Sequence, residues 1–190
     1  MNSKLSVFVS LVLCGMGLGQ DPGRDVPTRF DVIHNPELYR QKTPRETLGS
    51  VLGAISSDRY DYIVAHLLDS GFVAARLEEN RPYFERVATE QIGSTASGDI
   101  LKAKELRDRV TGIALRLNVK DLSDAIRHRL ASDPDDVRDL KRLLRDGEFT
   151  EAGDTATATL KDWKDRAVYF KKVDGRWFLE NRRTDRPAKE

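Results

Sequence analysis

A histidine and a tyrosine one helical turn apart are the residues of this chain best suited to proton-transfer chemistry. Tyr62 and His66 fall on a segment whose apolar residues recur at helical spacing, and Asp69 follows closely. Because histidine titrates near neutral pH, a desolvated pair of this kind could serve as general acid and base. The simpler interpretation, which we favour, is that both side chains edge a packed helix face and hydrogen-bond to neighbouring groups.

The remaining polar residues form no pattern typical of a particular chemistry. His34 lies in a turn, where we expect it to be solvated, and His128 lies among arginines, so the three histidines lack metal-ligand spacing. Ser56 and Ser57 lack the glycine elbow of a nucleophilic serine. The loop at 93–98 lacks the lysine and spacing of a phosphate loop. We therefore expect neither a metal nor a cofactor.

Trp163 is the residue whose position suggests binding. It lies in the segment 161–165 (KDWKD) between two expected strands, where polar residues are usual. An exposed tryptophan there could anchor a protein interface. The alternative is that Trp163 folds back onto a neighbouring helix, as large apolar side chains commonly do.

The first nineteen residues have the three parts of a secretory signal peptide. Lys4 supplies a positive start, residues 5–14 are apolar, and Gly17 and Gly19 place small residues before a cleavage site. The apolar run is shorter than the about 20 residues that span a bilayer. Cys14 follows a leucine, which makes a poor lipoprotein signal. We expect an exported protein, periplasmic or secreted, cleaved near Gly19 and without a stable membrane span.

Charge and cysteine content exclude two further classes. Charged residues make up 33% of the chain with a formal net charge of +1, and the two signs alternate along the expected helices. A nucleic-acid-binding surface needs a basic stripe or patch, so we expect no nucleic-acid partner. The single cysteine lies in the leader, so stability must come from a hydrophobic core rather than from disulfides.

The chain after the leader is expected to form a single α+β domain, with N-terminal and central helices packed on a C-terminal antiparallel sheet. Residues 20–42 are polar and proline-containing, which predicts a linker or loosely docked arm. The domain occupies 43–182, and 183–190 form a flexible tail. Residues 43–46 (TPRE) predict a capped helix start.

The middle of the domain, 71–145, is expected to be helical. Pro82 is suited to a helix start, and residues 93–98 are glycine- and serine-rich, which predicts a loop. A long helix with an apolar stripe from 100 to 117 and a shorter one near 122–130 should follow. Asp133 and Pro134 then predict a last helix that ends before Gly147.

The last quarter of the chain predicts the sheet. Residues 153–160, 167–173 and 176–181 are rich in β-branched and aromatic residues, and Asp174-Gly175 predicts a two-residue turn. That turn sets Phe170 opposite Leu179. It also places four apolar residues on one core face, namely Val168, Phe170, Trp177 and Leu179.

The register of the preceding strand follows from its alanines. Ala156 and Ala158 should share the core face with Phe170, so that the alternating threonines face away. We expect Ala158 to pair directly with Phe170. The connection is then the three residues 163–165, with Trp163 exposed at its tip.

Short segments in this order resemble secreted members of the nuclear-transport-factor-2-like (SnoaL-like) superfamily. They are residues 43–48 (TPRETL), 58–61 (DRYD), 153–156 (GDTA) and 174–178 (DGRWF). The likeness is closest to uncharacterised exported bacterial proteins of that type. It implies helices packed into the concave side of a curved sheet around a conical cavity, where enzymatic members place titratable residues; here these would be Tyr62 and His66. The enlarged helical middle departs from the superfamily pattern.

Two functions of different classes remain open. The first is an exported non-enzymatic domain that binds a protein partner or a small apolar ligand, with Trp163 as the candidate binding residue. The alternative is a small cavity enzyme, a hydrolase, isomerase or dehydratase, with His66 and Tyr62 as catalytic residues. No acid, base and nucleophile converge in the sequence, which favours the first function, and a homo-oligomer is compatible with either.

Overall fold

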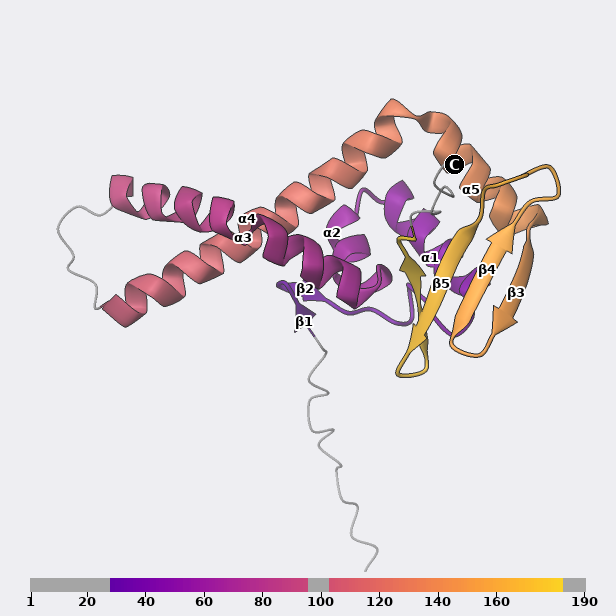
Figure 1. The fold of residues 1–190 in the computed structure, drawn as a ribbon, viewed down its shortest axis with the longest axis horizontal. Coiled ribbons are helices and arrows are strands. Elements are labelled where there is room, and N and C mark those ends of the chain that lie inside the picture. The colour runs from indigo at the N-terminus through magenta and orange to yellow at the C-terminus, as the bar shows by residue number, and fades with distance from the viewer. Residues whose placement is uncertain (1–27, 96–102, 183–190) are drawn as a thin grey trace, which may run out of the picture.

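Helices fill the first part of the chain and an antiparallel sheet ends it, so the α+β class is confirmed (Figure 1). The computed structural model describes residues 28–95 and 103–182, and the expected signal peptide and tail lie outside them. The elements are β1 (Thr28–Arg29), β2 (Val32–Ile33), α1 (Pro44–Ser56), α2 (Tyr60–Tyr62), the π-helix η1 (Ile63–Leu67), α3 (Ser70–Thr95), α4 (Ala103–Ser132), α5 (Pro134–Asp146), β3 (Glu148–Ala152), β4 (Thr155–Thr159), β5 (Val168–Val173) and β6 (Arg176–Glu180).

The start of α1 follows the sequence prediction. Thr43 Oγ1 accepts a hydrogen bond from the Glu46 N–H at 3.1 Å, and Pro44 occupies the first helical position. The Glu46 carboxylate reaches back to the N–H of Lys42 at 3.0 Å, one residue before the cap. The first of these bonds pairs an amide that a helix start leaves without an intrahelical partner. The boundaries of α5, at Pro134 and before Gly147, are likewise as predicted.

The helical middle is confirmed, but two of its expected breaks are wrong. Pro82 lies inside the continuous helix α3 instead of starting a helix, and α4 joins two segments that the sequence separates. Part of the expected loop at 93–98 is helical up to Thr95, and residues 96–102 lie outside the described residues. Phe84 and Ala88 of α3 pack on Ala114 of α4, so contacts between the helices override local breaking signals.

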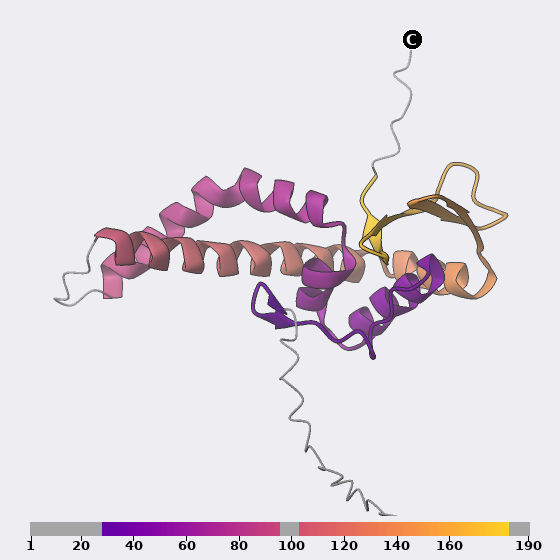
Figure 2. The same cartoon turned by 90° about the horizontal axis from the view of Figure 1, so that it is seen from below.

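Two of the helices cover one face of the sheet. Figure 2 shows α1 and α5 lying side by side beneath it, with the sheet curving over them. Leu48 from α1, Leu143 from α5, and Phe170 and Trp177 from the sheet are at most 1% exposed and fill the space between the layers.

The other two long helices, α3 and α4, pack mainly on each other. They form a hairpin that projects from the rest of the molecule, as both views show. A second hydrophobic core surrounds α2 and η1, and only the base of this hairpin joins it. Leu77, Val119 and Leu122 pack there. Within the described ranges, no helix is both long enough and apolar enough to cross a membrane.

The sheet has the order β3-β4-β5-β6, and its last hairpin has the predicted register. Phe170 pairs with Leu179, and the turn residues Asp174 and Gly175 have φ of 49° and 75°. Two consecutive positive φ values fit a type I′ turn, whose twist matches that of the strands it joins. Phe170 and Trp177 are buried on the core face, as predicted.

The register between β4 and β5 differs from the prediction by two residues. Ala156, rather than Ala158, pairs with Phe170. The alanines still share the core face, because a shift of two preserves the side-chain alternation. The connection is therefore 160–167, and Leu160 turns into the core at 4% exposure. The strand β3 was not predicted, and Gly153 lies in the turn that joins it to β4.

Candidate functional site

Tyr62 and His66 lie side by side inside the core around α2 and η1. Their ring centroids are 4.8 Å apart, and the two residues are 1% and 6% exposed. The sequence therefore predicts their proximity correctly. Neither residue lines either of the two surface grooves described below. Their placement fits the packed interpretation better than that of an acid and a base open to substrate.

A segment that we call the docked arm, residues 28–42, covers this pair. The expectation of a linker or loosely docked arm is wrong for these residues, because four of them are at most 8% exposed. They are Val32, His34, Tyr39 and Gln41. The Tyr39 ring lies 4.1 Å from that of Tyr62, between centroids. The arm therefore completes the second core.

The π-helix η1 provides the carbonyl groups that hold the arm. The last four carbonyls of a helix have no intrahelical partner. Arg29 Nη1 donates to the carbonyl of Ala65 at 3.1 Å, and Gln41 Nε2 donates to that of His66 at 2.9 Å. Gln41 Nε2 also donates to the carbonyl of Trp177 at 2.8 Å, which ties the arm to β6.

Two further hydrogen bonds join the arm to the candidate residues themselves. His66 Nε2 lies 2.9 Å from the carbonyl oxygen of Val32, so this nitrogen carries a proton and donates. The hydroxyl of Tyr62 accepts from the N–H of Asn35 at 3.0 Å. Both candidate side chains are therefore occupied in holding the arm.

His34 belongs to this cluster, and the prediction that it is solvated is wrong. It is 8% exposed, and its ring centroid lies 5.0 Å from that of His66. Its Nε2 lies 3.3 Å from Nη1 of Arg176, on β6. The contact joins residues 142 positions apart, so no local sequence signal could have revealed it.

Burial favours the neutral form of both histidines of the cluster. It lowers the pKa of His66; the hydrogen bond to Val32 opposes this, while His34, Arg29 and Arg176 lower the pKa further. Burial also lowers the pKa of His34, with Arg176 acting in the same direction and the side chain of Gln41 opposing. Burial raises the pKa of the Tyr62 hydroxyl. These directions disfavour charged forms of all three residues at neutral pH.

Trp163 lines a groove of about 290 Å³ between α5 and the β4–β5 connection. It is half-buried and packs against the sheet core, so its predicted position as an exposed tip is wrong. The guanidinium of Arg166 lies 4.8 Å from the centre of its ring. We call this site the Trp163 groove; its apolar wall also includes Leu130, Leu140 and Val168.

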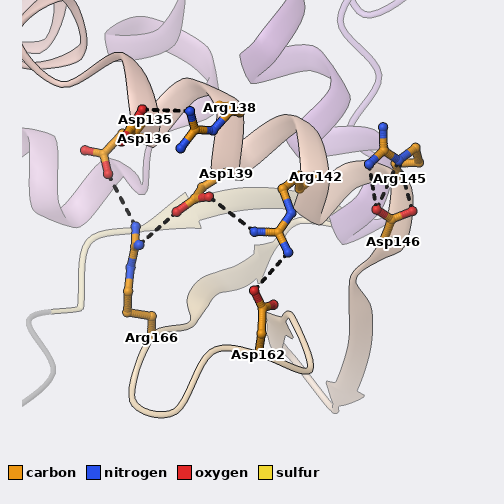
Figure 3. A network of polar contacts seen from close by, with 9 residues as sticks. All are labelled: Asp135, Asp136, Arg138, Asp139, Arg142, Arg145, Asp146, Asp162 and Arg166. Atoms are coloured by element: carbon orange, nitrogen blue, oxygen red, sulfur yellow. Dashed lines mark hydrogen bonds and ion pairs between the residues drawn. The ribbon is translucent and has the colours of Figure 1, made fainter.

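Ion pairs fasten the β4–β5 connection to α5 beside the Trp163 groove (Figure 3). Arg166 contacts Asp139 at 2.8 Å and Asp136 at 3.3 Å, and Arg142 contacts Asp162 at 2.9 Å. Both α5 and the β4–β5 connection supply arginine and aspartate side chains to these ion pairs. These carboxylates and guanidinium groups are thus already paired within the protein.

A second groove, of about 170 Å³, runs between α3 and α4. We call it the hairpin groove; Leu77, Ala114, Leu115 and Asn118 line it. Asn118 is 3% exposed, its Nδ2 donates to the carbonyl of Leu77 at 2.7 Å, and its Oδ1 has no hydrogen-bond partner. Leu115 stands outside the apolar stripe that predicts α4, and it is 41% exposed.

The fold and these sites define an α+β protein with a sealed histidine–tyrosine cluster, small surface grooves and a projecting helical hairpin. Among the described residues, no three His, Cys, Asp or Glu side chains gather as a metal site would require. Comparisons of the chain with known protein families, with curated proteins and with solved structures find no match.

Proposed function

We propose that this is an exported, non-enzymatic protein that binds a protein partner through the α3–α4 hairpin. The signal-peptide pattern of residues 1–19 supports export. The burial of Tyr62 and His66 supports a role without catalysis, because the docked arm stands between them and solvent and already uses their hydrogen-bonding groups.

The projection of the hairpin is the observation that carries this proposal. Its helices span 26 and 30 residues, and they pack mainly on each other rather than on the sheet. Tyr83, Leu106 and Leu115 are 38–56% exposed along it. The outer part of this hairpin adds little to the core of the body, whereas it offers extended helical faces to another protein.

The size of the hairpin groove favours a protein partner over a small ligand. This groove encloses about 170 Å³, whereas small-molecule pockets usually hold about 300 to 1,000 Å³. A partner helix lying along the hairpin groove could insert one apolar side chain between Leu77 and Leu115. This is the helix-in-groove mode of recognition.

Leu115→Glu tests the proposal, with Leu106→Glu as the matched control. Both leucines lie on α4 with similar exposure, but only Leu115 lines the hairpin groove. A photo-crosslinking amino acid at Tyr83, introduced into the exported protein in its native host, should capture one discrete partner. We expect Leu115→Glu to reduce this capture at least tenfold and Leu106→Glu to leave it nearly unchanged.

The same experiment separates the competing outcomes. An adduct of twice the mass of the chain would identify a second copy as the occupant. Capture that survives Leu115→Glu in folded protein, or that both variants abolish equally, would contradict binding at the hairpin groove.

A further inference from the structure

One contact between the docked arm and the sheet depends on the protonation state of a histidine. A guanidinium group carries only donors, so Nη1 of Arg176 on β6 donates and His34 Nε2 must accept across the 3.3 Å between them. An imidazole nitrogen accepts only when it carries no proton. The contact therefore exists only with neutral His34.

Protonation of His34 would reverse this interaction. Its Nε2 would become a donor pointing at the guanidinium donor, and two positive charges would meet in a part-buried site. Gln41 on the arm is the group that could favour the protonated form, since its Oε1 is buried without a hydrogen-bond partner. One neutral amide oxygen does not offset a cation at hydrogen-bonding distance.

The other groups around the cluster add positive rather than negative charge. Arg29 on β1 and Arg176 both act on His66, whose ring lies 5.0 Å from that of His34. Tyr62 on α2 is neutral. The nearby carboxylate is that of Asp69, after η1, and it lies 3.5 Å from Nζ of Lys171 on β5. Acidification would thus place new cations among existing ones.

We propose that residues 28–35 of the docked arm form an acid-released latch, held over Tyr62 and η1 by neutral His34 and set free when this histidine is protonated. Among the described residues, β1 and β2 pair only with each other, so no strand pairing ties this part of the arm to the rest of the protein. Release uncovers the Tyr62 hydroxyl and the Ala65 carbonyl, which lose their partners Asn35 and Arg29. The core between α1, α5 and the sheet, to which residues 28–35 contribute no side chain, stays intact.

The sign of the pH dependence follows from proton linkage. A histidine in the released arm regains its ordinary affinity for protons, with a pKa of about 6.5. The docked histidines bind protons more weakly, so protonation favours release. The latch should therefore be closed above this pH and open progressively below it.

Distance measurement between two spin labels tests the latch directly. Labels at Ile33→Cys on the arm and Lys141→Cys on α5 occupy exposed positions, with Cys14 replaced by serine. At pH 7.5 we expect one narrow distance distribution. At pH 5.0 a second, broad population of distances should appear, at least ten times larger than at pH 7.5. The far-UV circular dichroism spectrum should stay unchanged.

Two substitutions assign the effect to the cluster. His34→Gln can still accept from Arg176 but does not titrate, so it should remove most of the pH response. The control His128→Gln changes an exposed histidine of α4 and should respond as the unaltered protein does. If His34→Gln does not fold, Arg176→Gln should reduce the response, because it removes the facing cation. The latch would be overturned by a distance distribution that is constant with pH, or by a pH response that His34→Gln retains. A loss of helical signal together with release would also overturn it.

Discussion

At the residue scale, Trp177 is the side chain on which the sheet core depends most. It is 1% exposed, and its backbone N–H donates to the Gln41 carbonyl at 2.9 Å. We expect Trp177→Ala to lower the free energy of unfolding by about 3 to 5 kcal/mol, because it opens a large cavity. Arg176→Ala, one residue away and exposed, should lower it by much less. Urea denaturation of both variants at pH 7.5 measures this difference, and equal shifts would contradict the assigned faces of β6.

The buried histidines give a second prediction at this scale, on global stability. Because burial lowers the pKa of His66, the unfolded chain binds protons more readily than the folded protein just below pH 6.5. The free energy of unfolding should therefore fall as the pH is lowered from 7.5 to 5.5. His66→Gln should fold and show a shallower slope, whereas exposed His128→Gln should keep the original slope. Parallel slopes for all three proteins in urea denaturation would argue against His66 as the source.

At the scale of the element, α3 contains a proline that its packing tolerates. Pro82 has no N–H, so the carbonyl of Glu78 one turn earlier lacks its helical partner, and α3 bends along its length (Figure 2). Pro82→Ala should restore that bond and stabilise the protein by up to about 3 kcal/mol. Thermal unfolding measures the gain. A loss of stability would mean that the bend is needed for α3 to pack on α4.

At the scale of the whole molecule, buried contacts are unevenly distributed. The outer hairpin core has three buried residues, Phe84, Ala88 and Ala114, whereas the two cores of the body are much larger. We expect the outer hairpin to open locally without global unfolding, since opening exposes little apolar surface. Native-state hydrogen exchange should show weaker protection for residues 80–92 and 105–115 than for α1 and β5. Uniform protection would show instead that the hairpin and body unfold together.

Features encoded by neighbouring residues are predictable from the sequence alone. The cap at Thr43, the turn at Asp174-Gly175 and the burial of Phe170 and Trp177 depend on local hydrogen bonds, backbone φ preferences and side-chain alternation. The helix–sheet class follows from these same signals. So does the pairing of Tyr62 with His66, because positions one turn apart share a helix face.

The tertiary structure decided the features that depend on residues far apart in the chain. Alternation has a period of two, so it could not distinguish pairing of Phe170 with Ala158 from pairing with Ala156; burial of Leu160 accompanies the second. The helix continues through Pro82 because α4 packs against it. His34 became buried because Arg176 and the carbonyl-bearing end of η1 lie opposite the arm. Contacts of this kind carry no local pattern, since their energy comes from surfaces that meet only when the chain has folded.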